Sequence, residues 1–128
     1  MLPIRIIHHL PFVDVTLRAN GQSLRLEHVL LDTGSAGTVF RTDDLYRLGV
    51  LIQPDDPIRY MVGVGGYEAV IEKRIEAVEA GDLIATPFLV QLGALDYGIQ
   101  LDGILGLDFL LQTGAIINLR QMVLEKRI

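Results

Sequence analysis

Asp32 is the residue of this chain best placed to do chemistry, because an apolar run leads into it and a short polar loop follows. Residues 30–35 read Leu-Leu-Asp-Thr-Gly-Ser. A buried carboxylate is costly unless it is hydrogen-bonded or shares a proton. Gly34 allows a sharp turn close to the acid, and Thr33 and Ser35 supply hydroxyls that can donate to it or to nearby backbone. The stretch indicates an acid held at a strand end by its own loop, although a strand followed by an Asp-capped turn uses the same residue types.

The composition bounds the kinds of protein this chain can be. Its 128 residues suit a single domain, residues 1–128, and 50% hydrophobic with 21% charged residues is typical of a globular protein. The net charge of −5, without a basic patch, argues against nucleic acid as a partner. The chain has no cysteine, which excludes disulfides, zinc–thiolate sites and thiol catalysis.

The two ends and the apolar stretches give no sign of a membrane. Residues 1–11 lack the basic start and long apolar run of a signal peptide. The longest uncharged stretch, residues 83–95, contains Pro87 and Gly93 and falls short of the ~20 residues that a spanning helix needs. We expect a cytoplasmic protein with no membrane segment.

The strand that carries Asp32 is predicted as the second arm of a hairpin. Apolar and polar residues alternate over residues 12–18, Asn20-Gly21 is a strong turn signal, and residues 24–31 return as a strand that becomes wholly apolar. Further apolar runs predict short strands elsewhere, with a helix as the alternative for the run that begins at Tyr67. These strands are residues 38–40, 58–64, from 67 onward, 83–92 with Pro87 at an edge or bulge, 104–105, 115–119 and 122–126.

Two short helices complete the prediction. Thr42-Asp43-Asp44 offers capping residues for a helix that Gly49 ends, and residues 107–113 form a helix that Gly114 ends. The acid pairs Asp43-Asp44 and Asp55-Asp56 could suggest a metal site, but no cluster of partner ligands accompanies them. We expect no metal.

Other catalytic patterns are incomplete. Residues 33–37 lack the first glycine of a Gly-x-Ser-x-Gly elbow, and all three histidines precede them, which argues against a serine hydrolase. His8 and His9 are expected on a strand, pointing to opposite faces. Glu68 stands where a Gly-x-Gly-x-x-Gly motif needs its third glycine, so nucleotide binding has no support. We expect no cofactor.

Three separated stretches, in order, resemble the retropepsin-like aspartic proteases. The first is residues 30–35. The second, residues 61–67, reads Met-Val-Gly-Val-Gly-Gly-Tyr and looks like the glycine-rich flap hairpin of retroviral proteases. The third is the Gly-Ile-Leu-Gly of residues 103–106 followed by the helix of residues 107–113, which resembles the hydrophobic-hydrophobic-Gly segment of the family. Together they span most of the chain.

The resemblance implies an all-β, retropepsin-like acid protease fold: a closed, β-barrel-like sheet with a flap hairpin and one or two short helices. It implies an aspartic endopeptidase in which Asp32 is catalytic. The remaining implied site residues are Thr33, Gly34 and Ser35, which support the active-site loop; Met61, Val62, Gly63, Val64, Gly65, Gly66 and Tyr67, which form the flap and bind substrate; and Ile104, Leu105 and Gly106, which form the cleft wall and pack the loop.

The chemistry needs a second chain. In this type of site one carboxylate acts as general base on a water, while the other donates a proton to the scissile carbonyl. The chain has one Asp-Thr-Gly, so a C2 homodimer must bring Asp32 beside its symmetry mate. An extended peptide or unfolded protein is the expected substrate, bound by strand addition.

The sequence also departs from the retroviral pattern. Ser35 stands where retroviral enzymes carry Ala, and Ala36 and Gly37 stand at positions that are acidic there. Leu107 replaces their Arg. These changes leave the catalytic motif intact but alter interface and substrate-backbone contacts. The alternative interpretation is a peptide-binding or dimerisation module that has the fold but little turnover.

Overall fold

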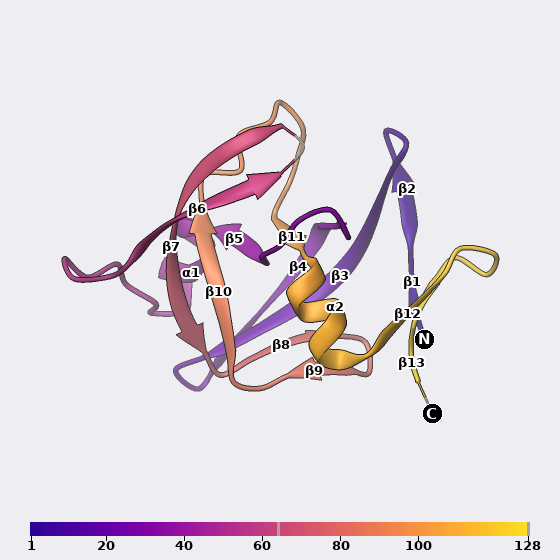
Figure 1. Cartoon of the computed structure of the whole chain (residues 1–128). Helices are drawn as coiled ribbons and strands as arrows, with labels where there is room; N and C mark the ends of the chain where they lie inside the picture. Colours follow the sequence, from indigo (N-terminus) through magenta and orange to yellow (C-terminus); the bar gives the residue numbers. More distant parts are fainter. Residues whose placement is uncertain (64, 128) are drawn as a thin grey trace.

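The computed structural model describes residues 1–63 and 65–127, which form thirteen strands and two short helices (Figure 1). In chain order these elements are β1 (Leu2–Pro3), β2 (Arg5–Ile7), β3 (Leu10–Ala19), β4 (Gln22–Leu31), β5 (Val39–Arg41), α1 (Thr42–Arg47), β6 (Ile58–Gly63), β7 (Gly66–Ile75), β8 (Ala77–Ala80), β9 (Leu83–Ala85), β10 (Phe88–Gly93), β11 (Gly103–Leu105), α2 (Leu107–Thr113), β12 (Ala115–Asn118) and β13 (Val123–Lys126).

Most strands belong to one large sheet that curls as a half-barrel, so the predicted all-β, retropepsin-like fold is confirmed. Its strand order is β6-β7-β10-β5-β11-β4-β3-β8-β9, and β2 pairs with β3 beside this path. The middle of the sheet mixes directions, because β11 runs parallel to β4 and antiparallel to β5, while β5 runs parallel to β10. Because β4 and β11 are parallel neighbours, the loops that follow them leave the same edge of the sheet side by side.

The predicted hairpin of β3 and β4 is present. Asn20 and Gly21 have φ values of 52° and 72°, the left-handed backbone that a two-residue turn between twisted strands requires. Alternate residues of β3, including Val13, Val15 and Leu17, are buried and point into the larger of two hydrophobic clusters. The long strand predicted from Tyr67 is likewise β7, and not a helix.

The hydrophobic core is mostly aliphatic. The larger cluster includes Phe88 and Phe109, whose rings meet edge to face at 5.9 Å between centroids and so join β10 to α2. A smaller cluster around Phe12, Val39 and Ile104 lies at the junction of β3, β5 and β11. The end of β4 contributes to both clusters, Leu31 to the larger one and Leu30 to the smaller one.

Three local predictions are wrong. Residues 83–92 were predicted as one strand but form two, β9 and β10, because Pro87 has no N–H to donate to a neighbouring strand. The second of them, β10, lies inside the sheet between β7 and β5 and not at an edge. His8 and His9 form the turn between β2 and β3 with φ of 52° and 64°, so they do not alternate along a strand, although both are exposed. Thr42 is the first residue of α1 and caps nothing; the N-cap is Arg41.

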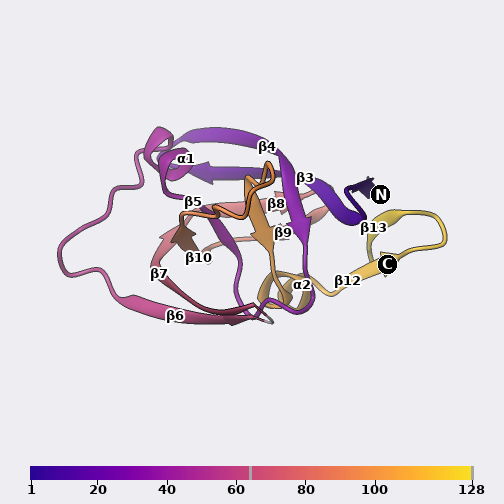
Figure 2. The same cartoon turned by 90° about the horizontal axis from the view of Figure 1, so that it is seen from above.

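The two ends of the chain pair with each other in a small sheet of order β1-β13-β12. It lies at the opposite end of the molecule from the β6–β7 hairpin, as both views show (Figures 1 and 2). Among the described residues, no helix is long and apolar enough to cross a membrane.

Candidate active site

Asp32 lies immediately after β4, where the parallel strand β11 ends beside it. Leu31 pairs with Leu105 at the end of this ladder, and the N–H of Asp32 donates to the carbonyl of Leu105 at 3.0 Å. The Asp32 residue is half-buried, whereas Leu105 is fully buried. The apolar run of β4 therefore ends with Asp32 at the boundary of the core and not inside it.

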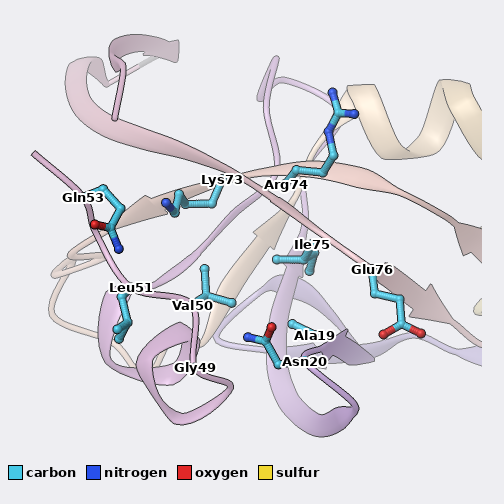
Figure 3. Close-up of a pocket in the computed structure, with 10 residues that line it drawn as sticks. All are labelled: Ala19, Asn20, Gly49, Val50, Leu51, Gln53, Lys73, Arg74, Ile75 and Glu76. Atoms are coloured by element: carbon cyan, nitrogen blue, oxygen red, sulfur yellow. The ribbon is translucent and has the colours of Figure 1, made fainter. Parts of the chain in front are cut away.

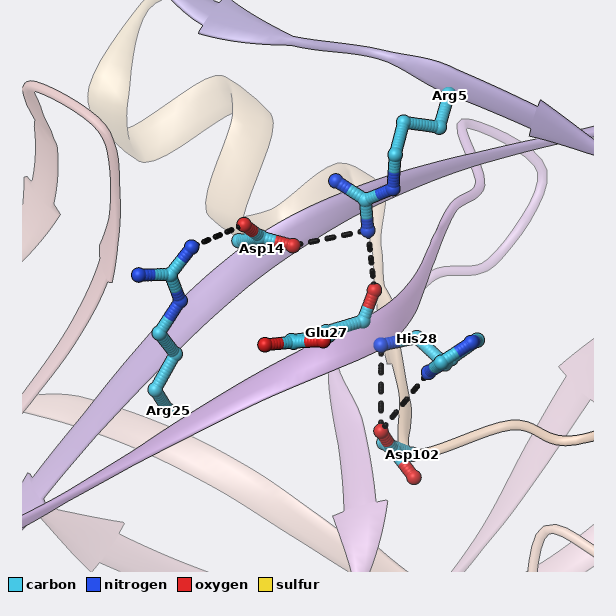
Figure 4. Close-up of polar contacts among 6 residues, drawn as sticks. All are labelled: Arg5, Asp14, Arg25, Glu27, His28 and Asp102. Atoms are coloured by element: carbon cyan, nitrogen blue, oxygen red, sulfur yellow. Dashed lines mark hydrogen bonds and ion pairs between the residues drawn. The ribbon is translucent and has the colours of Figure 1, made fainter.

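Two reciprocal bonds set the register of β4 and β11 just before these strands end, and Figure 4 shows the one that the N–H of His28 donates. The N–H of Asp102 donates to the carbonyl of His28 at 2.8 Å, and the N–H of His28 donates to Oδ2 of Asp102 at 3.2 Å. Nδ1 of the His28 ring lies 3.7 Å from the same oxygen. Because a one-residue slip would move Asp32 away from Leu105, this register positions the acid.

On the same stretch of sheet, Asp14 of β3 is flanked by two arginines (Figure 4). Arg5 and Arg25 lie 2.8 and 2.5 Å from its two oxygens, and Arg5 also donates to the carbonyl of Glu27. Burial alone would raise the pKa of Asp14, but the bonds and charges of Arg25 and Arg5 hold it below its ordinary value. These contacts join β2, β3 and β4 behind the Asp32 loop.

The loop after Asp32 closes on the acid itself. Oδ1 of Asp32 accepts the N–H of Gly34 at 2.9 Å, and its carbonyl accepts the N–H of Ser35 at 3.2 Å. The Ser35 hydroxyl is buried and donates to the carbonyl of Gly37 at 2.8 Å, so it supports the loop backbone. Thr33 and Gly34 are exposed on the outer side of the turn. The bond from Gly34 thus orients a carboxylate that belongs to a half-buried residue.

The loop is braced from behind by β11 and α2. The fully buried Thr38 hydroxyl accepts the N–H of Gly106 at 3.0 Å and donates to Oδ1 of Asp108 at 2.7 Å. The N–H of Leu107 donates to the carbonyl of Ser35 at 2.8 Å. Oδ1 of Asp108 also accepts the N–H of Phe109, at 2.8 Å. The first three of these bonds connect the loop to the strand end and the first turn of α2.

Gly106 allows this close packing. A Cβ built on it would lie far inside contact distance of the Gly37 carbonyl oxygen and 2.9 Å from the carbonyl oxygen of Ser35. Its neighbours Ile104 and Leu105 are buried in the core, and their role as a cleft wall stays a prediction. The predicted loop residues and the Ile-Leu-Gly segment are thus brought together.

The second predicted segment forms the β6–β7 hairpin, in which Val62 pairs with Tyr67 and Gly63 with Gly66. Tyr60 and Tyr67 are 71% and 78% exposed, and Val62 is also exposed. Val64 lies outside the described residues, and Met61 is described by its backbone position only. The hairpin is present; its role as a flap stays a prediction.

One side-chain bond ties the hairpin to the loop between β10 and β11. The hydroxyl of Tyr97 donates to the carboxylate of Glu68 on β7. This bond, with partial burial and the negative charge of Glu68, raises the pKa of Tyr97 to about 12. Tyr97 therefore stays a donor throughout the neutral range. No local sequence pattern indicates this contact.

A pocket of about 450 Å³ lies between the Asp32 loop and the hairpin. It is lined by Ala36, Gly37, Tyr60, Val62, Phe88, Leu89, Gln91, Asp108 and Gln112. The loop, β6, β10 and α2 all contribute to it. A peptide lying between the hairpin and the loop can place a side chain there.

A second pocket, of about 460 Å³, is formed by the β3–β4 turn, the segment after α1 and the far end of β7 (Figure 3). It shares no lining residue with the first pocket. Two of its polar groups are already used: Lys73 is paired with Asp56 at 2.9 Å, and the Asn20 amide donates to the carbonyl of Leu48 at 2.9 Å. Within residues 1–63 and 65–127, no group of three or more His, Asp or Glu side chains could hold a metal.

Sequence reasoning missed the residues that hold the loop in place. Thr38, Asp108, Asp102 and His28 were not predicted as site residues. The available signals were weak: Thr38 is a lone hydroxyl at the start of an apolar run, and Asp108 is an acid in the first turn of a short helix. Their partners lie about 70 residues away in the sequence, a separation that no local pattern reveals.

Solved structures with this fold define the class. The retropepsin-like aspartic protease of Rickettsia conorii superposes with a TM-score of 0.67, at 15% identity, covering 97% of this chain and 87% of that one. The retroviral protease-like domain of Ddi1 from Leishmania major superposes with a TM-score of 0.56, at 20% identity, covering 91% and 86%. The fold is that of the retropepsin-like aspartic proteases.

The sequence itself supplies the family. A family model described as aspartyl protease matches residues 14–109, about three quarters of the chain, from β3 through the first turn of α2. This protein belongs to the aspartyl protease family. Among curated protein sequences, none is similar enough to this chain to count as a match.

Proposed function

We propose that this protein is an aspartic endopeptidase whose active site forms between two copies of the chain. The observation that carries the proposal is the Asp32 loop: a half-buried carboxylate, oriented by the Gly34 N–H and braced through Thr38 by β11 and α2. Such rigidity is what a catalytic group needs, and a peptide-binding module would gain little from it. On this proposal, residues 1–128 form one domain that supplies half of each site.

The second copy supplies the second carboxylate. Two Asp32 side chains that meet across a two-fold axis cannot both be ionised, so they share one proton. The ionised member takes a proton from water as the water oxygen bonds to the scissile carbonyl carbon, and the protonated member donates to the carbonyl oxygen. Collapse of the tetrahedral species breaks the C–N bond, and the leaving nitrogen receives a proton from the pair. Thr33 is exposed beside Asp32, and on this proposal it packs against the loop of the partner chain.

The β6–β7 hairpin acts in this proposal as a flap over an extended peptide. The exposed edge strand β6 and the glycines Gly63, Gly65 and Gly66 offer backbone groups to a peptide strand. Tyr60, Val62 and Tyr67 would lose exposed surface when the peptide binds. No cofactor takes part in the reaction.

The test is cleavage of reduced, unfolded casein by the purified chain, with and without a statine-type inhibitor that mimics the tetrahedral species. Asp32→Asn keeps the shape but removes the proton exchange, so cleavage should vanish while the circular dichroism spectrum is retained. Asp55→Asn removes an exposed carboxylate elsewhere and is the matched control. Turnover by Asp32→Asn within tenfold of the unmutated protein would refute the assignment. Binding of casein without cleavage would favour a peptide-binding module.

A further inference from the structure

The pocket between the Asp32 loop and the hairpin has a lining that selects for charge. We propose that it is a specificity subsite that takes a basic side chain of the substrate peptide, arginine above all. The inference rests on the proposed peptidase function, because it assumes that a peptide lies between the hairpin and the loop. It adds the class of side chain that the site prefers.

The charge of the lining is negative. Among the described residues that line the pocket, Asp108 carries the one carboxyl group, and no Lys or Arg accompanies it. Its Oδ1 accepts bonds from Thr38 and from the N–H of Phe109, which fix the plane of the carboxylate. Those two bonds do not use Oδ2. A guanidinium or ammonium group in the pocket gains a charge-assisted bond to a carboxylate that is already oriented, whereas an acidic side chain is repelled.

Gln91 adds a second acceptor. Its Oε1 is buried and makes no hydrogen bond with the described residues. The amide is pressed against the backbone of Gly37, since a Cβ built there would lie 2.8 Å from Cδ of Gln91. A buried acceptor without a donor is destabilising, and a donor on a ligand relieves that cost. The pocket therefore favours a ligand side chain that has N–H donors as well as a positive charge.

Arginine suits these groups better than other side chains. Its planar guanidinium carries five N–H donors, enough for the carboxylate of Asp108 and the amide oxygen of Gln91 together. Its aliphatic stem can pack along the apolar part of the lining, formed by Val62, Phe88 and Leu89. Lysine offers the charge with a less directional set of donors, and citrulline offers the shape without the charge.

The experiment uses decapeptide libraries in which each position in turn is fixed as Arg, citrulline, Glu or Leu. The purified, unmutated protein digests each library, and mass spectrometry counts the products. We expect Arg to be preferred over citrulline by about tenfold at one position near the scissile bond, with Glu rejected there. Uniform preferences at every position would overturn the inference while leaving the peptidase function intact.

Two variants connect the preference to the pocket. Asp108→Asn removes the charge but keeps an Oδ1 that can accept from Thr38 and Phe109, and Gln91→Met removes the acceptor with little change of volume. Asp108→Asn should erase the preference for Arg over citrulline, and Gln91→Met should weaken it, with hydrolysis of the Leu peptides changed less. Asp55→Asn, the matched loss of an exposed charge, should change nothing. An unaltered Arg preference in Asp108→Asn would overturn the inference.

Binding separates this inference from the proposed function. Fluorescence anisotropy on the Asp32→Asn protein compares a labelled decapeptide carrying Arg with its citrulline counterpart and needs no turnover. If no library is cleaved but Arg binds about tenfold more tightly, the subsite stands and the peptidase function fails. If the two peptides bind equally, the subsite is refuted, whether or not cleavage occurs.

Discussion

The Asp32 loop and the β6–β7 hairpin line the same pocket, yet they are held in opposite ways. The loop is fixed by the buried hydroxyls of Thr38 and Ser35 and by the N–H of Gly106. The hairpin exposes Tyr60 and Tyr67, and one side-chain bond ties it to the loop before β11. In the proposed peptidase, the loop is the rigid part that orients the acid, and the hairpin is the part that moves to admit the substrate.

The contrast between the Asp32 loop and the β6–β7 hairpin has a physical basis. Elements with many buried bonds open only with the whole fold, whereas exposed hairpins open locally at little cost. A site that must both hold a carboxylate within a fraction of an ångström and accept an extended chain needs both kinds of element. The four predictions that follow probe this contrast, from the largest expected effect to the smallest.

The largest difference in unfolding free energy is expected between substitutions at two glycines, Gly106 behind the Asp32 loop and Gly65 in the hairpin. Gly106→Ala places a methyl group against the carbonyl oxygens of Gly37 and Ser35 and should cost about 3 kcal/mol or more of unfolding free energy. Gly65→Ala meets nothing within 4 Å and should change stability by less than about 0.5 kcal/mol. Urea denaturation measures both. Equal losses for the two variants would remove the contrast between rigid loop and open hairpin.

Next comes the hydrogen-bond brace behind the loop. Thr38→Val keeps the shape but leaves the buried N–H of Gly106 without its acceptor and Asp108 without one donor. We expect a loss of about 1–3 kcal/mol in unfolding free energy, and a further loss of activity because the Asp32 loop is displaced. Thr16→Val, a hydroxyl on β3 outside the site, is the control. A Thr38→Val protein with unchanged stability would show that the brace is unimportant.

A smaller effect is expected on the hairpin side. Tyr97→Phe removes the bond to Glu68 and should change the global unfolding free energy by less than about 0.5 kcal/mol, since the pair is largely exposed. Amide exchange of the hairpin should accelerate by up to about fivefold, while exchange in β4 and β11 should not change. Protection that falls equally in both regions would show that the hairpin does not open independently.

The smallest effect concerns pH at the base of the hairpin. Asp56 accepts the N–H of Gln53 at 2.6 Å and lies 2.9 Å from Nζ of Lys73, and these two interactions hold the pKa of Asp56 below its ordinary value. A lowered pKa gives stability that is present above the unfolded value, about 4, and is lost as pH falls through the folded value. Urea midpoints at pH 6 and pH 3 should fall further for the unmutated protein than for Asp56→Asn. Parallel declines would contradict this assignment.

Local sequence patterns identified most of the fold and the acid at its centre. The alternation of β3, the Asn20-Gly21 turn and the apolar run into Asp32 each carry their own signal, because period and turn chemistry are local properties. The resemblance then joined Asp32 to Gly106 across the chain. These features are confirmed as structure, while the roles of the site residues remain proposals.

Local patterns could not show which residues, distant in the sequence, contact one another in the fold. Thr38 and Asp108 meet across 70 residues, and Asp102 sets the register of β4 across 74. Pro87 and the His8–His9 pair were misjudged for the same reason: whether a segment breaks or turns depends on which neighbouring strand is available to pair with it. The pocket chemistry of Gln91 and Asp108 likewise arises only when β10 and α2 are packed together.

The central claim is that one working site needs Asp32 from two chains, and mixing tests it most directly. A fixed amount of the unmutated protein is incubated with increasing Asp32→Asn protein until subunits have exchanged, and casein cleavage is measured, with serum albumin as the control for added protein. If every site needs two Asp32 carboxylates, activity should fall to about half at an equal amount of the variant and to about a tenth at ninefold excess, as random pairing dictates. Activity that stays constant as the variant is added would show that each chain works alone and would contradict the account.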